Sequence, residues 1–409
     1  GAMDSTCLGS CYQGVAKLLC TRSLQRPAFE ASKASPRWMR GPSVSSADTF
    51  PAWPSSSTSD EGNAEWDSQV SCASDSVEGV VQAVMQEAGN SVSEWQGARF
   101  EVVRVIQEAP RNQGSVFLVN GLGSGGGFAA VKKMPTQWVA RGPAEFDRCY
   151  PGSSERPWLD IGVVRFLHDN GYAHICRPLG IFRDAEYTYV ASEFANRGDL
   201  FTWVCESTAS GSDIEKFMRP LAVQLVRAVR ALHDLGVAHQ DLSLENVLLS
   251  REGGDGAARV KLVDFAMASL SRWRSSGAIG KRSYIAPEQH LGPHDAFLAD
   301  AFSVGVCLYI LAIREYPWEY TARGMCKRFD FIAERGLRNY MKQRKVGKNS
   351  DMRLAQVISP ALLDVLEALL SVEPRFRACL GERVFSDEVS SPTATRVSVC
   401  DFPWLREEK

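Results

Sequence analysis

The sequence predicts an α+β fold in two unequal lobes, a small β-rich lobe followed by a larger α-helical lobe. Short runs of β-branched and aromatic residues, separated by turn residues, occupy positions 100–134. From residue 214 onward, apolar residues instead recur at every third or fourth position, which is the spacing of amphipathic helices. With 409 residues, 44% of them hydrophobic, the chain can bury one large core and still carry additional sequence.

Each lobe can be divided into expected elements. Residues 97–195 should contain a three-stranded antiparallel meander, then a helix and two further strands, and residues 196–409 should be helical. The expected strands are 100–106, 115–121, 127–134, 180–183 and 188–193. The expected helices are 159–167, a long helix from 214, then 299–313, 329–342 and 360–371.

The N-terminal residues differ in composition from the rest. Residues 1–75 are rich in Ser, Thr, Pro and Ala without a helical or strand period, so a mostly disordered arm is expected; its first three residues resemble the remnant of a cleaved tag. Apolar residues at helical spacing predict a docking helix within 76–96. A short helix that stays in solvent is the alternative.

Charge and cysteine content exclude several classes of protein. A formal net charge of -2 gives no electrostatic reason to bind nucleic acid or a membrane surface. The eleven cysteines include no CxxC pair, so we expect reduced thiols, an intracellular protein and no zinc site. No apolar run approaches the length that crosses a bilayer, so no transmembrane segment is expected. The sequence does not indicate an oligomeric state.

Three motifs follow the long helix in a fixed order. The chain reads HQDLSLEN at 239–246, LVDFA with its aspartate at 264, and YIAPEQ at 284–289. One such motif can arise by chance, but three in order at these spacings cannot easily do so. Asp241, Asn246 and Asp264 are then the polar groups that a protein kinase places around the ATP phosphates and the substrate hydroxyl.

From about 97 to 407 the chain resembles the eukaryotic protein kinase superfamily. Within it the chain is most similar to the apicomplexan FIKK kinases, through AVKKMPTQW, GKRSYIAPE and the degenerate glycine loop EAPRNQGSV. Rhoptry-type or no-Gly-loop apicomplexan kinases are the second choice. The resemblance implies the bilobal protein-kinase fold, ATP and Mg2+ as cofactors, protein substrates, and a cytoplasmic or cytoskeleton-associated location, with export into a host cell for a FIKK kinase.

The three motif residues have distinct expected roles. Asp241 is the candidate catalytic base, which orients the attacking hydroxyl and accepts its proton. Asn246 and Asp264 offer oxygen ligands that suit Mg2+. Lys132, in the run AAVK, matches the strand lysine that contacts the α- and β-phosphates. Its predicted ion-pair partner is Asp160, with Glu155 as the alternative if the helix starts earlier.

The glycine-rich stretches point to two different places. Gly121, Gly123 and Gly126 satisfy GxGxxG, but they lie too close to Lys132 to leave room for a strand between them, so a hairpin connection is expected. The stretch 109–116 is correctly placed for a phosphate-binding loop, although it keeps one of three glycines. The predicted ATP-binding residues are Lys132, Gly114, Val116, Ala130, Ser192, Glu193, Ala195 and Asp199.

Several positions depart from the kinase pattern. Gln240 replaces the arginine of HRD, so activation by loop phosphorylation is not expected, and Ala266 replaces the last glycine of DFG. Ser243 stands where Ser/Thr kinases carry a lysine, while Lys281 stands where they carry a threonine. We therefore expect Lys281 to supply the missing catalytic cation; a solvated loop lysine is the alternative.

The remaining candidates are structural or contact the substrate. Glu288 and Arg377 should form a buried bidentate pair, and Asp300 should bind backbone donors of the catalytic loop. Glu245 and Asp199 are expected to attract basic side chains near the acceptor, unless they only cap helices or loops.

The retained metal and hydroxyl contacts favour an active kinase, with Ser or Thr as the default acceptor. The lost glycines, together with Ala266 and Ser243, support a rival hypothesis, a weak or dead pseudokinase acting as a scaffold or allosteric binding module. A tyrosine-directed kinase is the lesser alternative, because the loop lysine is missing.

Overall fold

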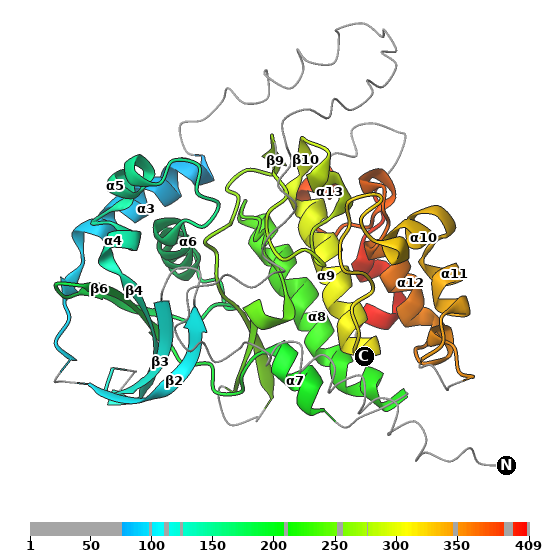
Figure 1. The fold of residues 1–409 in the computed structure, drawn as a ribbon, viewed down its shortest axis with the longest axis horizontal. Coiled ribbons are helices and arrows are strands. Elements are labelled where there is room, and N and C mark those ends of the chain that lie inside the picture. The colour runs from blue at the N-terminus through cyan, green and yellow to red at the C-terminus, as the bar shows by residue number, and fades with distance from the viewer. Residues whose placement is uncertain are drawn as a thin grey trace, which may run out of the picture.

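The computed structural model has two lobes with a sheet in the smaller one and helices in the larger one (Figure 1). This α+β architecture confirms the predicted fold class. The structure describes residues 76–97, 100–109, 114–122, 126–207, 212–251, 257–275, 277–346, 351–387 and 396–406. The predicted arm at 1–75 lies outside these residues.

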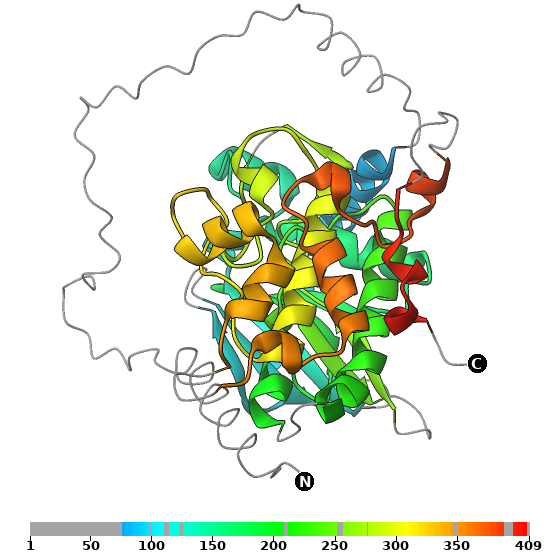
Figure 2. The same cartoon turned by 90° about the vertical axis from the view of Figure 1, so that its right-hand side faces the viewer.

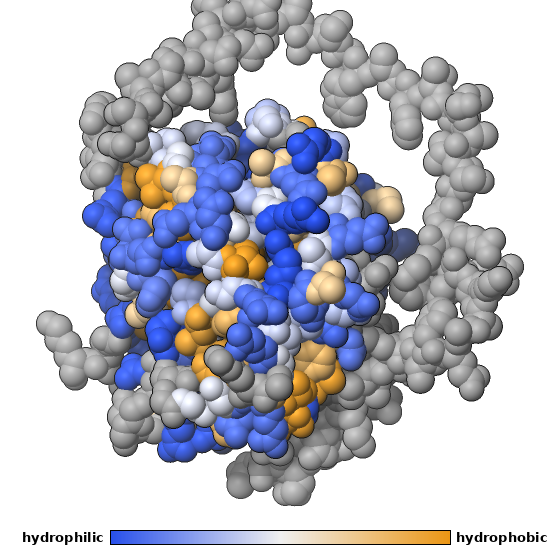
Figure 3. Space-filling model, turned by 90° about the vertical axis from the view of Figure 1, so that its left-hand side faces the viewer, coloured by the Kyte–Doolittle hydropathy of each residue, from blue (hydrophilic) through white to orange (hydrophobic). Residues whose placement is uncertain are grey.

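The N-lobe contains a six-stranded sheet in the order β1-β5-β6-β4-β3-β2. Its strands are β1 (Ser93–Glu94), β2 (Glu101–Ala109), β3 (Gly114–Asn120), β4 (Phe128–Pro135), β5 (Pro178–Arg183) and β6 (Tyr187–Glu193). β2, β3 and β4 pair antiparallel in sequence, as the predicted meander requires. The edge strand β2 exposes apolar side chains such as Val102, and this side of the molecule shows separate apolar patches on a mainly hydrophilic surface (Figure 3).

Two helices pack together beside this sheet. They are α3 (Val77–Asn90) and α6 (Pro157–Asp169), and α3 buries Val81 and Met85 against α6 instead of remaining in solvent. Gly162 of α6 permits this approach, because a Cβ at that position would lie 2.3 Å from Cγ of Met85. Ser76 caps the start of α3 by accepting a hydrogen bond from the Gly79 amide at 3.2 Å. The sequence thus joins an N-terminal helix to the helix that carries Asp160.

Two short helices between β4 and α6 were not predicted. They are α4 (Thr136–Val139) and α5 (Pro143–Cys149). Trp138 of α4 packs edge-on against Phe146 of α5, with ring centroids 5.5 Å apart. Helices of this length contain too few turns to show an apolar period, so their sequence gives little signal.

The C-lobe is built around two long helices, α8 (Ser212–Asp234) and α9 (Ala296–Ile313), as the second view also shows (Figure 2). Its other helices are α7 (Leu200–Glu206), α10 (Lys327–Arg335), α11 (Leu337–Gln343), α12 (Pro360–Leu369) and α13 (Arg383–Asp387). The single helix predicted at 329–342 is wrong: Gly336 has φ 84 and separates α10 from α11.

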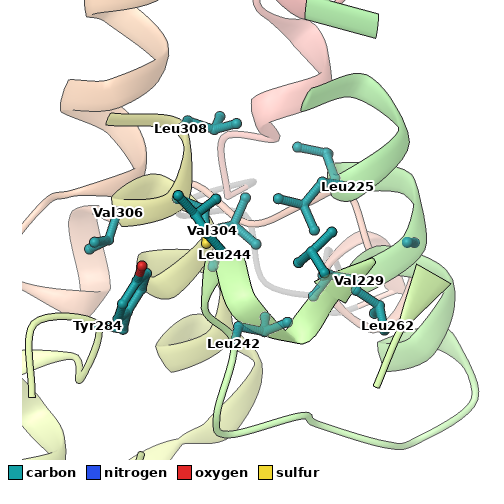
Figure 4. Packing of buried hydrophobic residues seen from close by; sticks show 14 of the residues in the cluster. Leu225, Val229, Leu242, Leu244, Leu262, Tyr284, Val304, Val306 and Leu308 are labelled. Carbon is teal, nitrogen blue, oxygen red and sulfur yellow. The ribbon is translucent and has the colours of Figure 1, made fainter. Parts of the chain in front are cut away.

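Short strands connect the catalytic elements to this helical core. β7 (Val247–Arg251) pairs with β8 (Ala258–Leu262), and β9 (Trp273–Arg274) pairs with β10 (His294–Asp295). Beneath the first hairpin, Leu242 and Leu244 point into an apolar cluster that includes Val229 of α8 and Val304 of α9 (Figure 4). Burying residues on both sides of Ser243 fixes the backbone of the HQDLSLEN segment.

Two expectations about the whole chain need correction. α9 is long and apolar enough to cross a membrane, contrary to the expectation that no run approaches that length, but it is completely buried inside the C-lobe. Cys205 is disulfide-bonded, so the expectation that every thiol is reduced is wrong at that position. The other cysteines of the described ranges form no disulfide bond.

Candidate active site

A cavity of about 1380 Å³ lies between the two lobes. The N-lobe strands β2, β3, β4 and β6 line one side of it, and the HQDLSLEN and LVDFA segments line the other. Most of the predicted site residues line this cavity: Val116, Ala130, Lys132, Asp160, Ser192, Glu193, Ala195, Asp199, Asp241, Glu245, Asn246, Asp264 and Lys281. These candidates come from separate parts of the chain, and the fold brings them together.

Lys132 lies at the centre of the N-lobe side. Its Nζ is 3.5 Å from Oδ2 of Asp160 and 3.8 Å from Oδ1 of Asp264. The other oxygen of Asp160 accepts a hydrogen bond from the backbone N–H of Phe265 at 2.9 Å. Asp160 therefore links the strand lysine to the LVDFA segment, despite being one methylene shorter than glutamate. Glu155, the alternative partner, lies before α6 and lines the same cavity.

Burial and charge act in opposite directions on this pair. Burial by itself lowers the pKa of Lys132, but Asp264 and Asp160 more than offset it and raise the pKa above its usual range. Burial raises the pKa of Asp160, and Lys132 opposes this rise. Lys132 is therefore held as a cation, the form that attracts phosphate oxygens.

Asp241 and Asn246 occupy the C-lobe side of the cavity. The side-chain amide of Asn246 donates to the backbone oxygen of Asp241 at 2.7 Å and to its Oδ2 at 3.3 Å. Burial raises the pKa of Asp241, opposed by Lys281 and His239. A carboxylate whose pKa moves upward toward neutrality accepts a proton more readily. The position of Asp241 is thus suited to a general base.

Asp300 organises the backbone just before Asp241. Its two carboxylate oxygens accept hydrogen bonds from the backbone N–H groups of His239 at 2.6 Å and Gln240 at 2.9 Å. Oδ1 of Asp300 also accepts a hydrogen bond from the side-chain amide of Gln240 at 3.2 Å, and Oδ2 lies 3.1 Å from Nε2 of His233. Gln240, which replaces the usual arginine, adopts φ 64 and also donates to the Ala296 carbonyl. The catalytic loop is therefore fixed from α9.

His233 extends this network in a way that the sequence did not reveal. Its Nδ1 lies 2.7 Å from Oε1 of Glu382, and its ring stacks on Phe297 with centroids 4.3 Å apart. Burial lowers the pKa of His233, but Asp300 and Glu382 raise it by more, so the pKa reaches about 9. His233 and Glu382 are 149 residues apart, so no local spacing could have linked them.

Lys281 bonds Ser243, the residue that stands in place of the loop lysine. Its Nζ donates to the hydroxyl of Ser243, and its backbone N–H donates to Oδ1 of Asp241 at 3.1 Å. Glu245 lies 3.6 Å from the same Nζ, so the charge that was expected to attract substrate is partly compensated here. The side chains of Lys281 and Glu245 are both partly exposed. This geometry brings a cation to the position left by Ser243.

Most of the candidates for nucleotide binding line the cavity, and Gly114 does not. Ala130 and Ser192 are opposite each other on β4 and β6, and both line the cavity with Glu193. Asp199 also lines it while capping α7, through a hydrogen bond from the Thr202 amide at 2.7 Å. Gly114 begins β3 and does not line the cavity.

The two candidate glycine loops fall on successive hairpins. Residues 110–113, between β2 and β3, and residues 123–125, between β3 and β4, lie outside the described residues, so Gly123 does too. Gly121 and Gly126 belong to the second hairpin, the position expected for a strand connection.

The donor set fits ATP with Mg2+. Asp264 and Asn246 present hard oxygen donors to the same cavity as the Lys132 ammonium group. Within the described ranges, no cluster of three or more His, Cys, Asp or Glu residues could hold a metal by itself. A pair of oxygen ligands suits a Mg2+ ion that is bound jointly with phosphates. Asp264 and Asn246 would hold the ion, which when bound would neutralise phosphate charge.

The predicted structural pair joins distant parts of the C-lobe. Arg377 donates from Nη2 to Oε2 of Glu288 at 2.9 Å, and its Nη1 contacts the other oxygen and the Leu298 carbonyl. Arg377 is fully buried, so removing either partner would leave a buried charge uncompensated.

These residues form one polar constellation that faces the cavity between the two lobes. Residues 160–386, more than half of the chain, match the protein kinase domain family, and the chain belongs to that family.

Named relatives agree with this assignment. Serine/threonine-protein kinase SRK2B of Arabidopsis thaliana is 36% identical over 169 residues, 40% of this chain and 45% of that protein. The cGMP-dependent protein kinase of Eimeria tenella is 33% identical over 168 residues, which cover 41% of this chain and 16% of that protein. CBL-interacting protein kinase 1 of Oryza sativa is 27% identical over 68% of this chain. The chain spans less than half of the length of the first two relatives.

Proposed function

We propose that this chain transfers the γ-phosphoryl group of ATP, bound with Mg2+, to a Ser or Thr hydroxyl of a protein, with Asp241 as the base. The observation that carries the proposal is the double contact of Asp160, which joins the Lys132 ammonium group to the Phe265 backbone. This contact aligns the phosphate-binding lysine with the metal-ligand candidate Asp264. Several relatives are named serine/threonine-protein kinases, which supports Ser or Thr as the acceptor.

In this proposal Lys281 steadies the transferred phosphoryl group. Its ammonium group bonds Ser243 and its backbone bonds Asp241, so the cation lies beside the base. A fixed cation close to developing negative charge lowers the barrier of phosphoryl transfer. Glu245 and Asp199 remain candidates for attracting basic substrates, although Lys281 compensates part of the charge of Glu245.

The closer kinship to FIKK kinases belongs to the same proposal. It is supported by the strings AVKKMPTQW and GKRSYIAPE and by the degenerate loop. A similarity to apicomplexan cGMP-dependent kinases is compatible with an apicomplexan setting. The intracellular location stays a prediction.

The test is phosphorylation of a peptide library with Ser, Thr and Tyr acceptors by the purified chain with ATP and Mg2+. We expect Asp241→Asn and Asp264→Ala to abolish transfer. Lys281→Ala should lower kcat roughly hundredfold, the size of effect expected when one charge-stabilising group is lost. Transfer by the parent chain equal to that of Asp264→Ala would overturn the enzyme proposal in favour of a scaffold. Full turnover by Lys281→Ala would overturn only the role of the lysine.

A further inference from the structure

The segment that carries Lys281 is bonded to the C-lobe before it reaches the active site. We call residues 267–275 and 277–283 the activation segment. Ser269 and Ala238 exchange two backbone hydrogen bonds of 2.8 Å each, which joins the segment to the catalytic loop. Further along, β9 of the segment pairs with β10, which directly precedes α9. The segment therefore crosses the start of α9.

A buried ion pair reinforces this crossing. Nε of Arg272 donates to Oδ2 of Asp295 at 2.7 Å, with side-chain exposures of 14% and 4%. The backbone oxygen of Arg272 also accepts from the Ala296 amide at 2.7 Å. The guanidinium group lies 4.3 Å from the ring centroid of Phe385, an arrangement that favours a cation.

Asp295 has a second function at the same place. Its Oδ1 accepts hydrogen bonds from the amides of Phe297 at 3.0 Å and Leu298 at 3.2 Å, so Asp295 caps the first turn of α9. Burial raises the pKa of Asp295, and Arg272 opposes that rise. The N-terminal end of α9 thus binds the activation segment through its cap residue Asp295 and the catalytic loop through Asp300.

The other end of the segment needs this alignment. Gly280 adopts φ 100, and a Cβ there would lie 2.9 Å from the backbone oxygen of Gln240 and 3.1 Å from Oδ1 of Asp241. The segment consequently passes directly against the catalytic loop just before Lys281. A small displacement of the segment would move the lysine away from Asp241 and Ser243.

We propose that the Arg272–Asp295 pair positions the activation segment, and with it Lys281, without any phosphate group on the segment. Gln240 supports this, because the position that would otherwise supply a cation for a phosphorylated segment is occupied by an amide that bonds Ala296 and Asp300. Arg272 and Asp295 are positioning residues, since neither lines the active-site cavity. The inference rests on the proposed function through the role of Lys281.

The main test compares the parent chain with a double variant that carries both Arg272→Ala and Asp295→Asn. Removing both charges leaves no uncompensated buried ion, and asparagine retains the helix cap. We expect kcat for a peptide to fall about tenfold to hundredfold and the peptide KM to rise, because misplacement of a catalytic group has effects of this size. The KM for ATP should not change. Arg272→Lys should recover part of the activity, since it restores a cation.

A matched control is Arg338→Ala, which removes ion pairs to Asp364 and Glu367 on the surface of the C-lobe. It should leave the kinetics and the thermal midpoint unchanged. Peptide kinetics in the double variant that match this control would overturn the proposal. A rise in the KM for ATP together with a large fall in thermal midpoint would also overturn it, since it would indicate general damage.

Amide hydrogen exchange gives a second measurement that does not depend on activity. Exchange within 268–275 and 277–283 should become faster in the double variant, while exchange in α12 should not change. Unchanged exchange in the segment would contradict the proposal even if activity fell. The two proposals can fail separately. If exchange became faster in the double variant but the parent chain transferred no phosphoryl group, the positioning role would stand and the proposed function would be refuted.

Discussion

The C-lobe wall of the active-site cleft rests on a buried polar network, whereas the N-lobe wall rests on a partly exposed ion pair and an apolar helix contact. Asp300 is 1% exposed and bonds the catalytic-loop backbone directly. On the other side, the side chains of Lys132 and Asp160 are 24% and 17% exposed, and α6 is held from behind by α3. Water can compete for the second arrangement far more easily than for the first.

This difference indicates where the molecule tolerates change. The base Asp241, and Asn246 bonded to it, follow a backbone segment that is costly to disturb. The lysine and its carboxylate partner depend on where α6 lies, and that position is set by packing against an N-terminal helix. Alterations of the C-lobe network should therefore appear in stability, and alterations of the α3 contact should appear in both stability and activity.

The largest effect is expected for Asp300→Ala. It leaves two backbone N–H groups and the cationic His233 without their carboxylate, so the free energy of unfolding should fall by about 3–5 kcal/mol. The thermal midpoint should fall by roughly 10 °C in a scanning calorimeter. Asp364→Ala, at the exposed pair with Arg338, is the control and should have little effect. A midpoint that matches the control would show that the network adds little to stability.

The next effect concerns pH. The pKa of His233 is raised to about 9 in the folded chain from the usual 6.5. A raised pKa contributes stability that is complete below pH 6.5 and is lost as the pH rises through about 9. The full contribution is about 3 kcal/mol, at 1.36 kcal/mol for each pKa unit.

His233→Gln removes the titrating group. The stability difference between the parent chain and this variant should therefore shrink by about 3 kcal/mol between pH 6.5 and pH 9, measured by urea unfolding. Subtracting the variant cancels the titration of groups that the two chains share. A difference that stays constant with pH would mean that His233 is neutral in the folded chain.

The sequence predicted the elements that carry local patterns. Short β-rich runs between turn residues gave the meander, the apolar spacing gave α6, α8 and α12, and the motif order gave the catalytic loop. Asp160 was placed by the apolar spacing of the expected helix together with the kinase resemblance, and the structure puts it 3.5 Å from Lys132. In each case the information lies within a few residues along the chain.

What could not be predicted depends on contacts between distant segments. His233 with Glu382 and Arg272 with Asp295 are ordinary charged residues in the sequence, and only the fold makes them neighbours. The break at Gly336 was missed because a single glycine within a helical pattern lowers the stability of a helix but does not by itself indicate that the helix ends there. The role of Gly162 was also hidden, because a glycine inside a helix gives no indication of what packs on it.

The smallest expected effect tests that packing. Gly162→Ala should destabilise the parent chain by about 1–3 kcal/mol, because the added methyl group meets Met85 and the helices must separate. Separation also moves Asp160 from Lys132, so kcat/KM should fall. In a Met85→Ala background the methyl group has space, and the same change should instead stabilise by about 0.5–1 kcal/mol through helix propensity.

The sign reversal is the decisive measurement, because it isolates the contact between the two helices. Thermal midpoints and kcat/KM of the four chains give the coupling between positions 85 and 162. Gly79→Ala, where a Cβ meets only Ser76 at 3.5 Å, is the control for helix propensity and should not destabilise the chain. If Gly162→Ala stabilised the parent chain as Gly79→Ala does, α3 would not lie on α6 in solution. The N-lobe wall would then depend on the Lys132–Asp160 pair alone.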